Sequence, residues 1–444
     1  MPNPFGSPSP QRCALEMSAS RVAEESKWRA AHTLLFLAFS TGTAIEAYVY
    51  SLPYIAETWT RFPRTIVALF SVWSPLWLLL GGLLVGPLSD RVGRKKTFYV
   101  TMTLYVIGGV LLVFAPNYQT ILASLSLLLF SAGGEYQNIL VATHELVPRR
   151  NRSASIFLVV NFTNLGGIVA AALSMANYTS PHTQRIVLGI TLVLAVAAIF
   201  AVRTRTPESI MWLEAKGRNT QAERELEKYY EQRATPNQED TSRGVVDVPI
   251  WFRLVTGSVM GWAYTAGFSL LVLTLGPYFF PQLTDEFIVV AGVAAFISGF
   301  VGLAADRLSR KWLLLASSVA TLTTASIFLP TQREWLANPQ LFWLLFIILS
   351  AFVNVFFLAE DALKSEFWPT ERRGFYTAIV RTASLGGSIP VLLYASTLPI
   401  TQYFYLGLAI FAAGVSVSAA WYRYGVETGK KRSVTIWGKQ QLSS

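Results

Sequence analysis

Two short charged segments of this chain repeat each other across 216 residues. The first is Gly86-Pro-Leu-Ser-Asp90-Arg91-Val-Gly-Arg94-Lys95, and the second is Gly302-Leu-Ala-Ala-Asp306-Arg307-Leu-Ser-Arg310-Lys311. Each follows a long apolar run and precedes another, and a bilayer core requires about 20 apolar residues for each crossing helix. Each segment is therefore predicted to be a charged turn between two membrane spans.

A second pair of segments repeats in the same order. Glu145-Leu-Val-Pro148 with Arg152 matches Glu366-Phe-Trp-Pro369 with Arg373, 221 residues further on. A chain that repeats its charged turns but not its apolar segments is expected to consist of two homologous halves. In membranes such a duplication indicates a transporter, because two halves can rock about a site between them.

The composition fits a chain that lies mostly in lipid. Apolar residues make up 52% and charged residues only 14%, whereas soluble domains carry roughly 25% charged residues. Open sheet edges do not occur in lipid, so we predict an all-α polytopic membrane protein with twelve transmembrane helices in two pseudo-symmetric six-helix bundles. The predicted spans are 31–56, 65–88, 97–115, 119–143, 153–176, 185–203, 252–280, 287–304, 312–330, 340–362, 374–397 and 402–422.

The net charge of +10 is explained by topology rather than by nucleic-acid binding. When the spans alternate in direction, 30 of the 36 Lys and Arg residues fall on one side, and positively charged loops stay cytoplasmic. We expect a multi-pass protein of the cell (plasma or inner) membrane with both termini in the cytoplasm. The predicted order is a cytoplasmic N-terminal segment (1–30), an N-terminal six-helix bundle (31–203), a cytoplasmic connection (204–249), a C-terminal six-helix bundle (250–424) and a cytoplasmic basic tail (425–444).

The sequence lacks the usual marks of an enzyme. It contains no nucleophile elbow, phosphate-binding loop or dinucleotide fingerprint. Its histidines, His32, His144 and His182, fall on separate segments, unlike a metal cluster. We therefore expect no enzymatic activity, cofactor or metal. The expected partners are a small-molecule substrate, protons and the lipid bilayer, and the chain is expected to be a monomer.

The connection between the halves has two predicted parts. Residues 214–228 carry charge pairs at the spacing of a surface helix, and residues 236–240 resemble a flexible linker. A nutrient sensor with a transporter fold is the alternative from another functional class, since it would signal through such segments. The short connection and tail leave little room for signalling parts.

With these segments identified, the chain resembles the major facilitator superfamily over nearly its whole length. The resemblance is to the branch of sugar porters, organic-ion transporters and metabolite–proton symporters. Residues 86–95 resemble the loop 2–3 signature and 302–311 its loop 8–9 copy, in which Ser309 replaces the second glycine. Pro207-Glu208-Ser209 resembles the Pro-Glu-Ser box, and Val426-Glu427-Thr428-Gly429-Lys430 resembles a terminal Pro-Glu-Thr-Lys-Gly box altered at its first and last positions.

The resemblance implies that these boxes form a cytoplasmic gate, which clasps the two halves together when the central site opens outward. Exposed ion pairs contribute at most about 1 kcal/mol each, whereas a partly buried network can form or break as one unit. Asp90 and Glu145 are expected to face Arg94 and Arg152. The expected gate residues are Asp90, Arg94, Glu145, Arg152, Glu208, Asp306, Arg310, Glu366, Arg373 and Glu427.

Charged residues inside spans are functional candidates, because each costs about 2.5–3.5 kcal/mol on insertion scales. Glu46 lies in the middle of the first span, where resembling transporters commonly carry an Asp that is protonatable in proton-coupled members. In proton-coupled sugar porters its partner is an Arg on span four. The matching position here falls near Leu125 and no Arg is present, which weakens the sugar-porter version of coupling.

Glu135 is the second acid inside a span. It follows Gly133-Gly134, and the Gly-Gly-Glu string resembles the metabolite–proton symporter branch. It precedes Glu145 by about 15 Å of helix rise, so it is expected deep in the membrane. Two buried acids without adjacent bases, Glu46 and Glu135, suit a proton pathway or a cation site.

Arg381 is the candidate base inside span eleven. It precedes Gly386, Gly387 and Pro390, a stretch that resembles span eleven of organic-anion and metabolite transporters. A guanidinium matches a carboxylate bidentately, so Arg381 is a candidate substrate clamp. In the alternative it pairs internally with an acid such as Glu360 or Asp361 at the end of span ten.

Polar and aromatic residues on further spans are expected to line a central cavity. The glutamine-rich box that sugar porters carry on span seven is missing, and residues 258–264 stand in its place. Glucose-like substrates are less favoured for that reason. The expected lining residues are Tyr48, Asn161, Asn164, Trp262, Tyr264 and Asn354.

The sequence therefore predicts a secondary active transporter that moves a small organic solute by alternating access. The preferred mechanism is proton-coupled symport of an organic anion or related metabolite, with Glu46 and Glu135 handling protons and Arg381 binding the substrate. A sugar or polyol transporter, proton-coupled or facilitative, is the alternative within this class.

Overall fold

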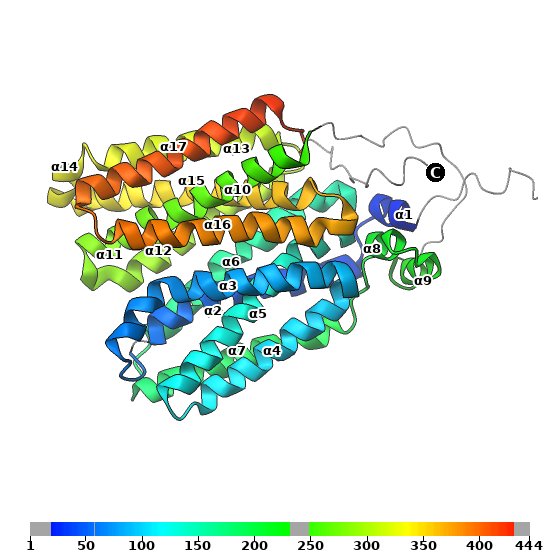
Figure 1. The fold of residues 1–444 in the computed structure, drawn as a ribbon, viewed down its shortest axis with the longest axis horizontal. Helices are drawn as coiled ribbons and strands as arrows, with labels where there is room; N and C mark the ends of the chain where they lie inside the picture. Colours follow the sequence, from blue (N-terminus) through cyan, green and yellow to red (C-terminus); the bar gives the residue numbers. More distant parts are fainter. Residues whose placement is uncertain (1–18, 57, 231–247, 430–444) are drawn as a thin grey trace, which may run out of the picture.

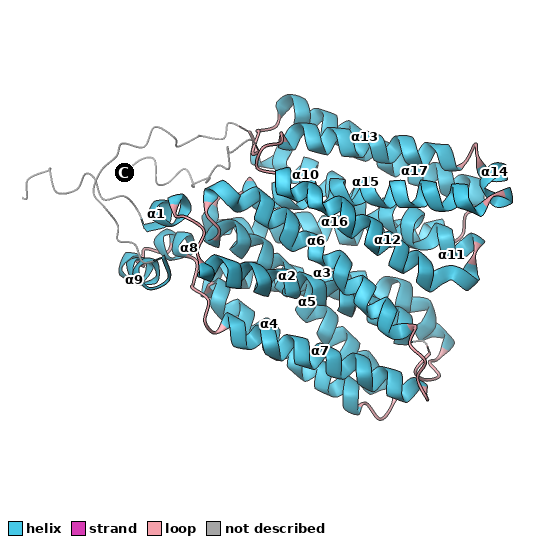
Figure 2. Ribbon diagram, turned by 180° about the vertical axis from the view of Figure 1, so that it is seen from behind, coloured by secondary structure: helices cyan, strands magenta, loops and turns pink. Residues whose placement is uncertain are grey.

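The computed structural model describes residues 19–56, 58–230 and 248–429, and this part of the chain contains helices and turns but no strand (Figures 1 and 2). The N-lobe consists of α2 (Ala30–Ala56), α3 (Arg64–Val92), α4 (Arg94–Phe114), α5 (Tyr118–Leu146), α6 (Arg152–Ser174) and α7 (Pro181–Arg203). The C-lobe consists of α10 (Ile250–Gly267), η3 (Phe268–Thr274), α11 (Leu275–Phe279), α12 (Thr284–Ser298), η5 (Gly299–Ala304), α13 (Arg310–Phe328), α14 (Gln332–Ala337), α15 (Pro339–Glu366), α16 (Arg373–Ala395) and α17 (Ile400–Tyr424).

The predicted fold class is confirmed. Eleven of the described helical segments are long and apolar enough to cross a membrane. The remaining predicted span, 119–143, is the 29-residue helix α5, which is less apolar because Ser131, Glu135 and Gln137 interrupt it. Every residue of α5 from Ser131 to Leu146 is buried, and the helix contacts α2, α3 and α4. The second half of α5 therefore lies in the interior of the protein.

Three short helices lie together at one end of the bundle, which we call the α1 end; α11 and α14 lie at the opposite, α14 end (Figure 1). The three short helices at the α1 end are α1 (Ala19–Glu25), α8 (Ile210–Ala215) and α9 (Asn219–Tyr230). They share a small apolar core. The helix predicted over 214–228 is thus mostly α9, while the predicted linker 236–240 lies outside the described residues.

The two repeated turns differ at their second glycine position, and the backbone explains why. Gly93 has a φ of 105°, a left-handed conformation that favours glycine. Ser309 has a φ of −71° and caps α13, since its hydroxyl accepts from the Trp312 backbone N–H at 3.2 Å. Serine at 309 is therefore compatible with the same kind of charged turn.

The lobes meet along two helix pairs, α3 with α16 and α6 with α12. Each lobe has its own apolar core. A third buried cluster near the α1 end draws residues from both lobes, including Phe157 of α6 and Met260 of α10. The lobes are thus closely packed at the α1 end.

Close helix contacts depend on particular glycines. A Cβ on Gly166 of α6 would lie 1.8 Å from the Ala44 carbonyl oxygen of α2, whereas a Cβ on neighbouring Gly167 would meet nothing within 4 Å. We expect Gly166→Ala to destabilise the protein by about 1–3 kcal/mol, because overpacking forces the backbone apart. Thermal unfolding in detergent measures this, with Gly167→Ala as the matched control; equal melting temperatures for the two variants would contradict the contact.

Candidate functional site

A central cavity of about 220 Å³ lies between the lobes. Helices of both lobes line it, and its lining residues are mainly apolar or aromatic. Among them, Tyr264 stacks on Phe357 with ring centroids 4.3 Å apart, and on Phe268 at 5.7 Å. Phe268 belongs to η3, a π-helical turn, a feature frequent at functional sites. The charged lining residues are Glu46, Glu360, Lys364 and Arg381.

Glu46 and Arg381 form an ion pair across this cavity. Arg381 Nη2, on α16 of the C-lobe, donates to Glu46 Oε1, on α2 of the N-lobe. The Arg381 guanidinium also lies 3.9 Å from the ring centroid of Tyr136 on α5. The expectation that Glu46 lacks an adjacent base is therefore wrong. Of the two interpretations of Arg381, internal pairing applies in this conformation, but the partner is Glu46 rather than Glu360 or Asp361.

A second charged group, which we call the α15 triad, consists of Glu360, Asp361 and Lys364. Lys364 Nζ lies 2.9 Å from Glu360 Oε2 and 2.5 Å from Asp361 Oδ1. The Tyr136 hydroxyl of the N-lobe donates to Asp361 Oδ2, so the triad also bridges the lobes. All three side chains are at least 95% buried.

Lys364 was not predicted to be a site residue, because it lies beyond the end of the predicted span 340–362. The helix α15 continues to Glu366, which places Lys364 inside the protein. The spacing of Glu360, Asp361 and Lys364 at i, i+1 and i+4 was the available signal, since acids and a base at this spacing lie on one helix face.

The predicted lining residues separate into two groups. Asn164 and Tyr264 line the cavity. The other four lie behind its wall. Tyr48 points into the N-lobe core, where its hydroxyl donates to the Leu188 carbonyl at 2.9 Å, and Trp262 Nε1 donates to the Gly387 carbonyl at 3.1 Å. Tyr48 and Trp262 were predicted to line the cavity, but the structure places them behind its wall, where their polar atoms donate to backbone carbonyls.

Asn161 and Asn354 join Asn164 in an amide cluster between the lobes. Asn164 Nδ2 donates to Asn161 Oδ1 at 3.0 Å and to Asn354 Oδ1 at 2.9 Å. Asn354 Nδ2 donates to the Ala295 carbonyl of α12 at 2.7 Å. Asn161 and Asn354 are nearly fully buried, so they hold α6 and α15 together while Asn164 reaches the cavity.

Glu135 lies in the N-lobe interior, outside the cavity lining. Its Oε1 lies 2.6 Å from Arg203 Nη2 of α7, and its Oε2 accepts from the Thr101 hydroxyl at 2.5 Å. The Arg203 guanidinium lies 3.6 Å from the ring centroid of Phe98. The expectation that Glu135 lacks an adjacent base is wrong, because the end of span six supplies Arg203.

At the α1 end, the gate residues of the N-lobe form a buried network. Arg94 binds Glu145 through two hydrogen bonds of 2.9 Å and Asp90 through one of 3.0 Å. Arg373 of the C-lobe donates to the same Glu145 at 3.0 Å. Glu145 therefore joins one arginine from each lobe.

The two repeated aspartates cap helices of the opposite lobe. The Asp90 carboxylate accepts from the backbone N–H groups of Gly374 and Phe375 at 3.2 and 2.8 Å, at the start of α16. The Asp306 carboxylate accepts from those of Ser153 and Ala154 at 3.1 and 3.2 Å, at the start of α6. Carboxylates stabilise helix N-termini, so this reciprocal capping closes the α1 end.

Two of the remaining C-lobe gate contacts, those of Arg310 with Glu366 and with Glu427, correspond to contacts in the N-lobe. Arg310 Nη2 donates to Glu366 Oε1 at 3.1 Å, and the Ser153 hydroxyl of the N-lobe donates to the same oxygen at 3.3 Å. Glu427 Oε1 accepts from the Arg310 backbone N–H at 2.7 Å.

Glu208 occupies the corresponding place in the N-lobe. Its carboxylate accepts from the backbone N–H of Arg94 at 2.9 Å, and burial raises the pKa of the Glu208 carboxyl above its ordinary value. Arg152 differs from expectation, since it forms an ion pair of 2.7 Å with Glu24 of α1. Arg152 thus ties the gate to the short helices at the α1 end.

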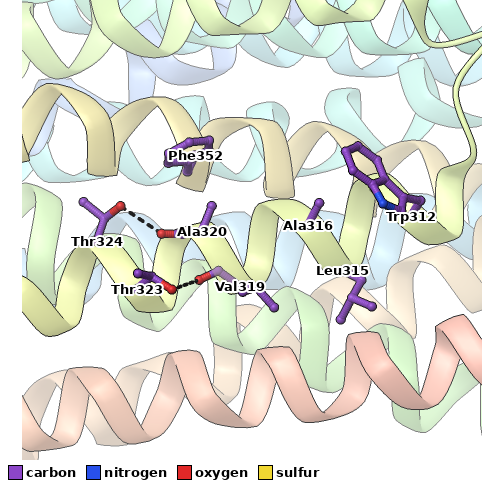
Figure 3. A pocket seen from close by; sticks show the side chains of 8 residues that line it. All are labelled: Trp312, Leu315, Ala316, Val319, Ala320, Thr323, Thr324 and Phe352. Atoms are coloured by element: carbon purple, nitrogen blue, oxygen red, sulfur yellow. Dashed lines mark hydrogen bonds between the residues drawn. The ribbon is translucent and has the colours of Figure 1, made fainter.

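A second pocket, of about 480 Å³ and widely open at the surface, lies between α13 and α15 (Figure 3). Its two hydroxyls are already used, since Thr323 donates to the Val319 carbonyl and Thr324 to the Ala320 carbonyl. It has no charged lining residue, so it offers a polar solute no anchor. Its lining residues are Trp312, Leu315, Ala316, Val319, Ala320, Thr323, Thr324 and Phe352.

Comparisons with known proteins agree with this architecture. The family model described as "Sugar (and other) transporter" matches residues 63–417. The 4-hydroxybenzoate transporter PcaK of Acinetobacter baylyi is 26% identical over 378 residues, which cover 78% of this chain and 79% of that protein. The niacin transporter NiaP of the same organism is 28% identical over 188 residues, which cover 42% of this chain and 41% of NiaP.

Among solved structures, the fold is similar to that of the proton:xylose symporter XylE bound to 6-bromo-6-deoxy-D-glucose. The TM-score is 0.73 at 16% identity, and the match covers 93% of this chain and 99% of XylE.

Proposed function

Because the chain belongs to the sugar (and other) transporter family of the major facilitator superfamily, we propose that it carries a small organic anion together with a proton. Its fold and relatives are those of transporters and not of enzymes. In this proposal the chain lies in the cell membrane with its α1 end in the cytoplasm, as the distribution of Lys and Arg favours. The closed gate then leaves substrate access from outside.

The observation that carries the proposal is the ion pair between Glu46 and Arg381 on the cavity wall. A guanidinium stays charged at all accessible pH values, so Arg381 always requires an anion beside it. A proton on Glu46 removes that anion, and the carboxylate of a substrate can take its place. Proton binding and anion binding are thereby coupled at one pair of residues.

The aromatic lining favours a planar substrate. Tyr264, Phe268 and Phe357 form a stack beside the charged residues, and aromatic rings prefer offset-stacked or edge-to-face contacts worth about 0.5–1.5 kcal/mol. The related proteins PcaK and NiaP carry the names of transporters of 4-hydroxybenzoate and niacin. We therefore propose an aromatic monocarboxylate as the substrate class.

A sugar is the second candidate. The family description and the symporter XylE favour it. A neutral sugar would not need to compete with Glu46 for Arg381, so its uptake should not depend on opening this pair.

Glu46→Gln tests the coupling in proteoliposomes. Wild-type protein should take up radiolabelled benzoate at least several-fold faster when the external pH is lowered. The glutamine variant, which cannot release a proton, should lose that stimulation while still exchanging internal for external benzoate. Full proton dependence in the variant would contradict the role of Glu46, and uptake of xylose in place of benzoate by the wild type would favour the sugar.

A further inference from the structure

One oxygen of Glu360 has neither a hydrogen bond nor an ion pair with any described residue. Its Oε2 lies 2.9 Å from Lys364 Nζ, but its Oε1 accepts no hydrogen bond from any described residue, although only 2% of the residue is exposed. Glu360 lines the central cavity. Buried polar atoms nearly always have a hydrogen-bond partner, so this oxygen calls for an explanation.

The neighbours of Glu360 do not provide that partner. The Ser384 hydroxyl, which lies across from it on α16, donates to the Val380 carbonyl at 2.8 Å. Lys364 lies between Glu360 and Asp361, and the Tyr136 hydroxyl is used by Asp361.

Gly261 of α10 lies against both this oxygen and the Ser384 side chain. A Cβ at position 261 would lie 3.3 Å from Glu360 Oε1 and 2.2 Å from Ser384 Oγ. Gly261 itself lines the cavity, so a larger side chain at position 261 would crowd Glu360 and Ser384 at the cavity wall.

We propose that Glu360 Oε1 accepts a hydrogen bond from a hydroxyl or N–H group of the substrate. This inference rests on the proposed function and narrows its substrate class to aromatic carboxylates that carry a hydrogen-bond donor on the ring. The carboxylate of such a molecule binds Arg381 on α16 while its donor reaches Glu360 on α15. A neutral donor suits this position, because Lys364 already supplies the positive charge that Glu360 requires.

The test compares ligands of matched shape on the whole protein in proteoliposomes. Benzoate has no ring donor, 4-methoxybenzoate adds an oxygen that only accepts, and 4-hydroxybenzoate and 4-aminobenzoate add a donor; the 3-substituted series covers the other ring position. The concentration at which each unlabelled compound inhibits uptake of radiolabelled benzoate gives its relative affinity. We expect hydroxy and amino compounds to bind about 10-fold or more tightly than methoxy compounds in at least one series, since hydrogen bonds to charged groups are among the stronger ones.

Two variants test whether Glu360 is responsible. The preference for donors should fall several-fold in Glu360→Gln, whose amide oxygen is a weaker acceptor, and vanish in Glu360→Leu. Benzoate affinity is the internal measure of folding in each variant. Thr265→Val is the matched control, because Thr265 lines the same cavity but its hydroxyl donates to the Gly261 carbonyl at 2.8 Å. The preference for donors in this variant should match that of the wild type.

Three other results would contradict the substrate class, the assignment to Glu360 or the proposed function itself. A wild type that transports benzoate without preferring donors refutes the narrower substrate class and leaves anion transport standing. A preference that persists unchanged in Glu360→Leu refutes the assignment to Glu360. A wild type that transports none of these carboxylates refutes the proposed function, and the inference falls with it.

Discussion

Replacement of Arg381 by Met is expected to lower uptake of an aromatic carboxylate by at least about 100-fold. The substitution keeps much of the side-chain volume but removes the cation that binds Glu46 across the lobes. Leaving one partner of a buried ion pair alone costs about 3–5 kcal/mol, and the substrate also loses its charged anchor. Both effects act on the same cavity.

Two further variants separate these effects. Arg381→Lys keeps the charge but lacks the planar fork of arginine, so it should retain weak uptake that exceeds that of Arg381→Met. The double variant Glu46→Gln with Arg381→Met removes both charges, and its thermal stability should return toward that of the wild type without recovery of uptake. Uptake by Arg381→Met at the wild-type rate would exclude Arg381 from substrate binding.

The gate was predictable from the sequence because its residues are repeated. Asp90 and Asp306 occupy equivalent places in two copies of one turn, and the structure places each at the start of a helix in the opposite lobe. The repeat does not predict which residue each of these side chains contacts. Arg152 and Arg373 are equivalent in sequence, yet the first forms an ion pair with Glu24 and the second with Glu145.

The cavity was predictable only in part, for a reason specific to membranes. In water, apolar and polar faces of a helix reveal which side is buried. In lipid both faces are apolar, so the sequence does not show which way a residue such as Tyr48 points; Tyr50, two positions later, lines the cavity instead. The charges of Glu46 and Arg381 mark them as functional, but their pairing joins residues 335 positions apart, and no local pattern encodes it.

Glu145→Gln is expected to open the α1 end and to abolish uptake. Glu145 lies between Arg94 and Arg373, and none of the three side chains is more than 1% exposed. Without its negative charge, two guanidinium groups remain buried close together, and breaking a buried pair costs about 3–5 kcal/mol. The lobes can relieve this cost by separating at the α1 end, which admits water to both arginines but holds the carrier in one conformation.

A cysteine at position 378 reports this opening, in a background where Cys13 is replaced by serine. Ala378 is 1% exposed and faces Gly86 of the other lobe, so Ala378→Cys should react slowly with a water-soluble maleimide in the closed state. Glu145→Gln should raise its labelling rate at least about 10-fold. Glu214→Gln is the control, because Glu214 binds Ser20 among the short helices and not between the lobes, and it should leave both labelling and uptake near wild type. Slow labelling together with normal uptake in Glu145→Gln would contradict this prediction. It would mean that the contacts of Asp90 and Asp306 with the helix starts of the opposite lobe keep the α1 end closed without Glu145.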